Sequence, residues 1–383
     1  MSPELHLFII WANARFQRAK IIDDIDSHFS IVEVTDLKWD ADNFSNNLTR
    51  FYGESLPDGS FKEIECGTDR FTLVIVLDNN PLYEKRKTTK GFSIVNTRVF
   101  DAKERYRQWT GGGHKIHATN NINETRHDLM LLSGISYSDY FTRVNEDSYV
   151  PILEGRSDRN LAGCIQWNSL AELFATLNET SEYVVLRNYR DMPERYCMDE
   201  HGDVDLLVRD RNQVRHLMNA KPVSNKRYRS HVKVNINNQT LRFDIRYVGD
   251  NYYDRRWQQQ ILENRVFYKG FYVPHREDYK YSLLYHALIH KPKVGSDYKE
   301  ILLEQGVDTA GMMEQLKTYM EEREYEFVEP GDLSVYFNCK PLDLTPGVKR
   351  RLHESKTRSY DKLLSMISPE HQRRLRKIVS KIF

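Results

Sequence analysis

Short apolar runs, separated by turn-forming and charged segments, dominate the first part of the chain. Residues 5–11 and 71–77 are apolar almost throughout and have the length of buried strands. Residues 15–29 fit a helix between early strands, and residues 119–132 fit a second helix that ends at a Ser-Gly pair. The pattern predicts a mixed α/β module over residues 1–145.

A second set of strand-like segments follows in the middle of the chain. Residues 183–186 and 203–208 are strongly apolar, and residues 233–237 and 240–248 are predicted to pair as a hairpin across an Asn-Asn turn. The fold class that we predict is α/β. The expected parts are an N-terminal α/β module (1–145), a connector (146–180), a second α/β module (181–300) and a helical C-terminal region (301–383).

The charge of the chain is nearly balanced overall but unevenly distributed. Its 383 residues include 56 Lys and Arg against 55 Asp and Glu, a formal net charge of +1. Such a balance argues against general nucleic-acid binding, and we predict no specific nucleic-acid partner. Residues 349–383 contain eleven basic and three acidic side chains, a net charge of +8, so the preceding residues carry −7.

The basic C-terminal segment also carries an apolar stripe. Its members fall on one face of a helix: Leu375, Ile378, Val379, Ile382 and Phe383. Two interpretations stay open for this helix. It packs on the body of the protein, or it lies on an anionic membrane surface as a peripheral contact.

The expected location of the protein is the cytoplasm, with the inner face of the membrane as the site of any peripheral contact. No apolar stretch approaches the ~20 residues of a membrane span. The apolar run near the N-terminus has no basic region before it and no small-residue cleavage site after it, unlike a signal peptide. The four cysteines lie far apart and form no CxxC pair, which favours a reducing compartment. The sequence indicates no oligomeric state.

Three aspartates occupy strand positions that are predicted to converge. Asp203 and Asp205 open an apolar strand two residues apart, so their side chains share one face. Asp244 lies in the segment 240–248, where it alternates with apolar residues and faces away from them. Two neighbouring strands would therefore bring three carboxylates to one point.

A cation relieves the repulsion among convergent carboxylates, which are costly to ionise together. Mg²⁺, or Mn²⁺ in its place, takes hard oxygen ligands and phosphate oxygens, and two such ions activate the attacking oxygen and neutralise the leaving group. The pattern predicts metal-dependent phosphoryl or nucleotidyl transfer from a nucleoside triphosphate, with Asp203, Asp205 and Asp244 as metal ligands and catalytic residues.

The segment GDVDLLV (202–208), with Asp244 in a later strand, resembles the nucleotidyltransferase-fold superfamily. Among its branches, it most resembles uncharacterised bacterial nucleotidyltransferase-like proteins, several of which belong to surface-polysaccharide gene sets. The resemblance covers residues 181–300. It implies that Asp203, Asp205 and Asp244 bind two divalent ions and the triphosphate, and that the acceptor is a small molecule such as a sugar or glycan intermediate.

One position departs from the pattern of this superfamily. A Gly-Ser pair usually ends the preceding strand and cradles phosphate, whereas this chain has Leu-Arg-Asn-Tyr at 186–189. Arg187 replaces backbone donors with a charged fork and is our candidate phosphate ligand. An equally open interpretation is that the site has lost nucleotidyl transfer and serves another chemistry. The alternatives are a nucleotide-sugar-dependent glycosyltransferase that uses the DxD at 203–205, a non-catalytic nucleotide-binding module, and a solvated strand start without function.

A glycine-rich stretch in the first module is a second candidate site, for phosphate or nucleotide. Its predicted binding residues are Gly111, Gly112, Gly113, His114 and Lys115. Three glycines permit backbone geometries closed to other residues and can form an anion nest. The stretch faintly resembles the phosphate loop of the ParB/sulfiredoxin fold. A Gly-rich turn with surface histidines is the plain alternative. A metal site that includes His117 and His127 is a further one, although the spacing fits no zinc pattern.

Two further positions bear on the second module. His286 and His290 lie one turn apart on a helix predicted at 279–290, which we expect to pack against the sheet, with metal binding as the alternative. Asp254 is predicted to cap a helix that begins at Arg255.

Overall fold

The structure is a computed structural model that describes residues 2–88, 91–195, 202–226 and 229–365. Its chain divides into two compact units. The first comprises Met1–Ser181, Asn212–Ala220 and Asn235–Gln239, and the second comprises Glu182–Arg211, Lys221–Val234 and Thr240–Phe383. Helices and mixed sheets together confirm the α/β class.

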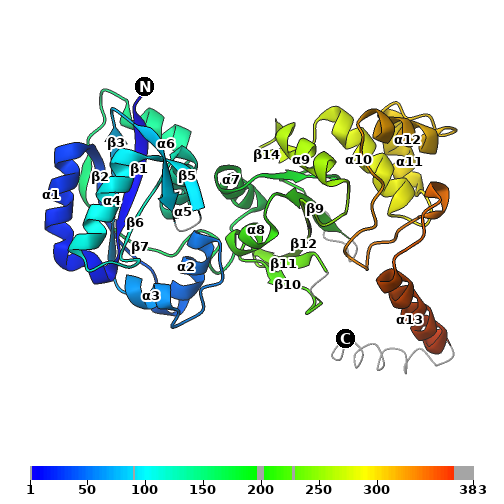
Figure 1. The fold of residues 1–383 in the computed structure, drawn as a ribbon, viewed down its shortest axis with the longest axis horizontal. Coiled ribbons are helices and arrows are strands. Elements are labelled where there is room, and N and C mark those ends of the chain that lie inside the picture. The colour runs from blue at the N-terminus through cyan, green and yellow to red at the C-terminus, as the bar shows by residue number, and fades with distance from the viewer. Residues whose placement is uncertain (1, 89–90, 196–201, 227–228, 366–383) are drawn as a thin grey trace. The chain divides into compact units, whose positions relative to one another are not determined.

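A five-stranded sheet in the order β6-β1-β3-β2-β7 forms the centre of the first unit (Figure 1). Its strands are β1 (Glu4–Ile10), β2 (Ser30–Lys38), β3 (Phe71–Asp78), β6 (Ile116–Ala118) and β7 (Ile152–Asp158). β7 pairs with β2 in parallel, whereas the other neighbours are antiparallel. Apolar side chains of α1 (Arg18–His28) and α4 (Thr97–Trp109) pack with Phe8, Val34 and Val74 of the sheet in one core.

The strands predicted at 5–11 and 71–77 are confirmed as β1 and β3. The helix predicted at 15–29 begins as a 3₁₀ turn, Ala12–Gln17, before α1. The residues of the expected connector contain β7 and α7. The other elements of the first unit are α2 (Phe44–Tyr52), α3 (Phe61–Cys66), the hairpin β4 (Tyr83–Thr88) and β5 (Gly91–Asn96), α5 (Ile122–Ser133), α6 (Tyr137–Val144), α7 (Leu170–Thr180) and α8 (Arg211–Leu217).

A second five-stranded sheet has the order β10-β11-β12-β9-β8. Its strands are β8 (Tyr183–Val185), β9 (Asp203–Val208), β10 (Lys221–Pro222), β11 (His231–Ile236) and β12 (Gln239–Tyr247). The predicted hairpin is confirmed as β11 and β12. Asn237 and Asn238 form its turn with φ of 46° and 60°, the left-handed region that asparagine tolerates better than most residues.

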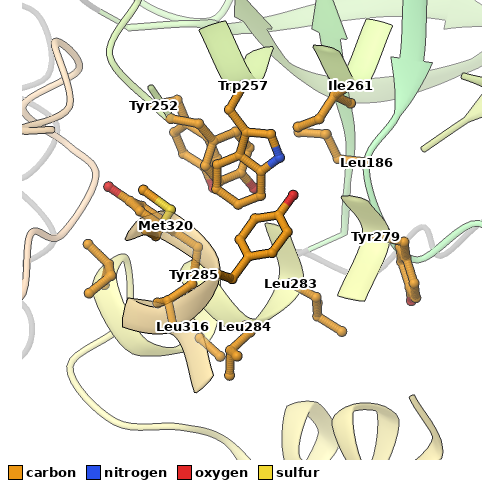
Figure 2. Packing of buried hydrophobic residues seen from close by; sticks show 14 of the residues in the cluster. Leu186, Tyr252, Trp257, Ile261, Tyr279, Leu283, Leu284, Tyr285, Leu316 and Met320 are labelled. Atoms are coloured by element: carbon orange, nitrogen blue, oxygen red, sulfur yellow. The ribbon is translucent and has the colours of Figure 1, made fainter. Parts of the chain in front are cut away.

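Helices of the second unit bury an aromatic core, part of which Figure 2 shows. Trp257 of α9 (Arg255–Glu263) lies against Tyr285 of α10 (Arg276–Ile289), with ring centroids 5.8 Å apart. Asp254 caps α9 by accepting hydrogen bonds from the amides of Arg256 and Trp257, as predicted. The other elements of this unit are β13 (Val266–Tyr268), β14 (Phe271–Val273), α11 (Ser296–Glu304), α12 (Met312–Glu322) and α13 (Val348–Ser365).

The described part of the C-terminal region, up to residue 365, is less continuously helical than predicted. Between α12 and α13 the chain makes only the 3₁₀ turn Lys340–Leu342. The predicted apolar stripe at 375–383 lies outside the described residues. Within the described ranges, none of the helices combines the length and the apolar character that crossing a membrane requires.

Candidate functional site

The parallel pairing of β9 and β12 places the predicted aspartates together. Asp244 lies opposite Asp205, and Arg242 lies opposite Asp203. Asp205 and Asp244 are buried, with 8% and 5% of their surface exposed, whereas Asp203 is half-buried. Because residues opposite each other in neighbouring strands share a face of the sheet, Asp244 and Asp205 lie on the same face, as the sequence predicts.

Each buried aspartate is paired with an arginine. Arg187 Nη2 donates to Asp205 Oδ1 at 2.6 Å and to Tyr252 Oη at 3.1 Å. Arg246 donates to Asp244 Oδ2 through Nη2 at 2.6 Å and through Nε at 2.9 Å. Arg187, predicted as a phosphate ligand, therefore borders the site while its guanidinium holds a carboxylate.

A fourth acid and a hydroxyl complete the pairing of Asp244. Arg246 Nη1 also reaches Asp332 Oδ2 at 3.3 Å. Ser230 Oγ donates to Asp244 Oδ1 and lies 3.2 Å from Asp332 Oδ2. Asp244, Arg246 and Asp332 thus form one buried ionic cluster.

The two central carboxylates titrate in opposite directions. Burial raises the pKa of Asp205, and the nearby charge of Asp244 adds to this rise, while Arg187 opposes it. Burial is also the largest single influence on Asp244 and works to raise its pKa, but the charges of Arg246 and His231 and the hydrogen bonds from Ser230 and Arg246 together outweigh it, so that pKa lies below its usual range. Asp205 is therefore the better proton acceptor of the pair.

His231 flanks the third aspartate. Its Nε2 lies 3.4 Å from Asp203 Oδ2, and this hydrogen bond raises the pKa of His231 against the effect of burial. Its Nδ1 is buried without a partner among the described residues.

The carboxylates of β9 and β12 border a cavity of about 690 Å³. Around Asp203, Asp205 and Asp244 it is polar, and its other walls include aromatic and imidazole groups. The cavity is lined by residues from several elements: Arg187, Asn188, Met192, Gly202, Val204, His231, Arg246, Tyr252, His286, His290, Lys291, Pro292, Tyr298, Ser334, Val335 and Tyr336. Its volume suits a ligand of the size of a nucleotide or a small sugar.

The donor chemistry of this site fits a hard divalent cation. Asp203, Asp205 and Asp244 supply carboxylate oxygens, and Asp205 Oδ2 makes no hydrogen bond with the described residues. Within those residues, however, the side chains do not gather into a group of three or more His, Cys, Asp or Glu that would hold a metal. Two of the three carboxylates are instead paired with guanidinium groups, Asp205 with Arg187 and Asp244 with Arg246.

The glycine-rich stretch of the first unit uses its amides internally. Gly111, Gly112 and Gly113 have φ of 82°, 82° and 75°. The amide of Gly112 donates to the Arg107 carbonyl at 2.7 Å, and that of His114 donates to Glu65 Oε2 at 2.8 Å. The amides of Gly112 and His114 are therefore already paired within the first unit, one with a nearby carbonyl and one with a carboxylate distant in sequence.

The predicted cationic groups of this stretch are engaged as well. Lys115 Nζ donates to the Thr110 carbonyl at 2.9 Å, and burial lowers the pKa of His114. β6 separates the turn from α5, whose N-terminus at Ile122 is capped by Asn121. The helix thus does not follow the glycines directly.

His117 and His127 instead share one carboxylate. His117 Nε2 lies 2.6 Å from Asp128 Oδ2, and His127 Nδ1 lies 2.9 Å from Asp128 Oδ1. Burial works to raise the pKa of Asp128, but His117 above all outweighs it and lowers that pKa. The sequence offered both histidines as metal ligands and did not predict their pairing with Asp128.

A buried lysine beside this region gives a pH prediction. Lys103 Nζ donates to Asn120 Oδ1 at 2.6 Å, and burial lowers the pKa of Lys103 to about 8. The unfolded chain keeps that proton up to about pH 10.4, so from pH 8 to 10.4 it binds more protons than the folded state. Folding stability of the wild type should therefore rise relative to Lys103→Met by up to about 3 kcal/mol across that window. Urea unfolding at pH 7.5 and pH 10.5 measures this, and a constant difference would contradict the assignment.

Several functional groups escaped sequence reasoning. Arg246 lies two residues after Asp244 on the same face of a strand, and this phase was a usable signal. Asp332 comes from an irregular segment, and the chain around it gave no local signal. Tyr252, which the sequence left open as a sugar- or base-contacting residue, is fully buried beside Arg187 and belongs to the cavity wall, where its ring and hydroxyl both make contacts.

Comparisons with known proteins add little to this geometry. No family model matches the sequence, and no curated protein matches it. One solved structure that aligns with it is an orthorhombic crystal form of the Aquifex aeolicus nucleoside diphosphate kinase. That alignment covers 33% of this chain and 93% of the other at 14% identity, with a TM-score of 0.24. A similarity this low carries no argument about fold or function.

Proposed function

We propose that the second unit transfers a phosphoryl or nucleotidyl group from a nucleoside triphosphate to a hydroxyl acceptor, as the nucleotidyltransferase resemblance implies. The adjacent pairing of Asp205 with Asp244, at the wall of a cavity of about 690 Å³, carries this proposal. The same cavity contains Lys291, whose ammonium group suits phosphate charge.

The residues divide the chemistry among them. Asp205 accepts the proton of the acceptor hydroxyl, because its pKa is raised and its Oδ2 makes no hydrogen bond with the described residues. The acceptor oxygen then bonds to phosphorus, and the bond from that phosphorus to its bridging oxygen breaks, so pyrophosphate leaves in nucleotidyl transfer and a nucleoside diphosphate leaves in phosphoryl transfer. Asp203 and Asp244 would hold Mg²⁺ or Mn²⁺, which neutralises phosphate charge when bound, and the neighbouring charge of Asp205 would strengthen cation binding until Asp205 takes the proton. Arg187 and Arg246 orient the carboxylates.

Calorimetry with Mn²⁺ and a panel of nucleotides tests this function. We expect metal-dependent triphosphate binding that weakens at least tenfold in Asp203→Asn. Turnover of a nucleotide-sugar in place of a plain triphosphate would favour a glycosyltransferase. Binding without turnover of either would favour a non-catalytic module. No nucleotide binding at all, or binding unchanged by Asp203→Asn, would contradict the proposal.

We propose that the protein is located in the cytoplasm, where nucleoside triphosphates occur. The described cysteines, Cys66, Cys164 and Cys339, are free thiols, as a reducing compartment favours. Peripheral membrane contact through the basic C-terminal helix remains a prediction.

The first unit supports a second candidate function, phosphoryl transfer through His117. A carboxylate at 2.6 Å from Nε2 fixes the imidazole so that Nδ1 is the nitrogen with the lone pair. Arg107 donates to the carbonyl of the adjacent Ile116, and Lys62 lies 3.8 Å from the ring of Tyr52, which contacts His117 edge-on. Both cations also pair with acids, Arg107 with Glu104 and Lys62 with Glu54, so the imidazole held by Asp128 is the observation that carries this candidate.

We propose that Nδ1 of His117 attacks the γ-phosphorus of a nucleoside triphosphate. The new bond joins nitrogen to phosphorus, the bond to the bridging oxygen breaks, and a nucleoside diphosphate leaves. Incubation with γ-phosphate-labelled ATP should give an acid-labile, alkali-stable label that His117→Asn removes and His127→Asn retains. A label retained in His117→Asn, or none in the wild type, would rule this function out.

A further inference from the structure

The hairpin of β4 and β5 forms a two-stranded sheet of its own in the first unit. Its base is anchored, because Val95 and Asn96 are fully buried and the amide of Asn96 donates to the Asn120 carbonyl at 2.7 Å. Nearer the tip this burial ends, and Ile94 and Phe92 are 57% and 70% exposed. Two neighbouring large apolar side chains on an anchored hairpin mark a surface that another apolar phase can cover.

The register of the hairpin places these apolar side chains on one face with two lysines. Lys85 lies opposite Ile94, and Lys87 lies opposite Phe92. Because residues two apart in a strand share a face, all four side chains project from the same side of the hairpin. Lys85 Nζ lies 5.6 Å from the ring centroid of Phe92, as this arrangement requires. Both lysines are exposed, and neither has an ion pair with another described residue.

The positive charge of this face is available to a partner. On the opposite face Arg86 is paired with Glu84, so that its charge is already compensated. Residues 1–181 as a whole contain more acidic than basic side chains. An extended strand from Asn96 to Gly91 nevertheless spans about 17 Å, which exceeds the Debye length of about 8 Å at physiological ionic strength. The acidic body is therefore largely screened from a partner at the tip.

We propose that this lysine–aromatic face, defined by Lys85, Lys87, Phe92 and Ile94, binds the surface of a bilayer that contains anionic phospholipid. Phe92 and Ile94 enter the boundary between head groups and acyl chains. The ammonium groups stay at the level of the phosphates, because the long stem of lysine lets its charge reach outward from an apolar contact. Each lysine strengthens binding to an anionic surface by about fivefold.

The composition of this face favours a bilayer over other partners. A nucleic acid would pair its phosphates with the lysines and stack a base on Phe92, but Ile94 has no ring on which a base can stack. A second copy of the same face would bring lysines against lysines. An anionic bilayer accepts all four side chains. The proposal concerns where the protein binds and is independent of both proposed transfer reactions.

Cosedimentation of the full chain with lipid vesicles tests the proposal. The vesicles contain phosphatidylcholine with about one-third phosphatidylserine, and pure phosphatidylcholine vesicles are the reference. We expect the wild type to prefer the anionic vesicles. Binding should weaken by about tenfold or more in Phe92→Ser combined with Ile94→Ser, and in Lys85→Gln combined with Lys87→Gln. All four side chains are exposed, so both variants should unfold at the wild-type temperature.

Phe16 is the matched control, because it is also 70% exposed in the first unit while its basic neighbours, Arg15 and Arg18, are paired with Asp36. Phe16→Ser should bind vesicles as the wild type does. Tryptophan at either position locates the contact. Brominated phospholipid in the vesicles should quench the added fluorescence of Phe92→Trp but not that of Phe16→Trp. This readout separates the hairpin from any contact through the basic C-terminal segment.

Four outcomes would overturn the proposal. They are no binding of the wild type to anionic vesicles, equal binding to pure phosphatidylcholine, unchanged binding in Phe92→Ser combined with Ile94→Ser, and no quenching in Phe92→Trp. Binding through the C-terminal segment alone would give the last two. Single-stranded DNA is the competing probe. If it binds the wild type, loses affinity in the same double variant, and vesicles do not bind, the face recognises nucleic acid and the proposal fails.

Discussion

Asp205→Asn should abolish transfer from a nucleoside triphosphate, lowering kcat by about 10³-fold or more. The amide still accepts a hydrogen bond from Arg187, but it cannot take a proton and it contributes no charge to a divalent cation. The same change should weaken Mn²⁺ binding, because Asp205 lies beside Asp244 at the wall of the cavity. Initial rates at saturating nucleotide and a Mn²⁺ titration by electron paramagnetic resonance measure the two effects.

Two further variants make this prediction specific. Asp297→Asn removes an exposed carboxylate of the same unit, outside the cavity lining, and should keep wild-type kcat. Asp203→Asn should also lower kcat, with less risk to folding because Asp203 is half-buried and its contact is with His231 at 3.4 Å. Activity of Asp205→Asn within tenfold of the wild type, in folded protein, would remove this carboxylate from the chemistry.

The sequence was sufficient for the aspartates because their positions follow from local periodicity. Two acids open one apolar strand, and a third acid lies on the polar face of another strand. These three side chains meet if the two strands are neighbours in the sheet. The pairing of β9 with β12 makes the two strands neighbours and places Asp244 opposite Asp205. Strand alternation likewise predicted the hairpin of β11 and β12 from its Asn-Asn turn.

One acid of this cluster could not be predicted from local sequence patterns. Asp332 joins the cluster from the segment between α12 and α13, which has neither helical nor strand periodicity. The glycine-rich stretch illustrates the opposite problem. Its composition suits an anion nest, but Glu65, distant in sequence, accepts the amide proton of His114. Only the tertiary structure decides which neighbour satisfies a donor, so composition alone overestimates free donors.

Arg246→Met should destabilise the second unit by about 3–5 kcal/mol at pH 7. Arg246 is 3% exposed in its side chain, bonds twice to Asp244, reaches Asp332 at 3.3 Å, and lies 4.5 Å from the ring centroid of Tyr252. Its removal leaves two buried carboxylates without their cation. Chemical denaturation at pH 7 measures the loss. Arg242→Met changes an exposed arginine of the same strand and should cost less than about 1 kcal/mol.

The pH dependence of this loss identifies its cause. In the wild type, the pKa of Asp244 lies below its usual range, so its stabilising pairing is present above about pH 4 and lost as pH falls further. In Arg246→Met, burial acts unopposed by that arginine and raises the pKa of Asp244, so protonation on acidification stabilises the folded variant. The difference in unfolding free energy between wild type and variant should therefore narrow as pH falls from 7 toward 4.

Asp244→Asn combined with Arg246→Met should recover part of the lost stability at pH 7, because one unpaired charge is gone. A gap independent of pH, with no recovery in the double variant, would show that packing of the long side chain against Tyr252, rather than charge, is what Arg246 contributes.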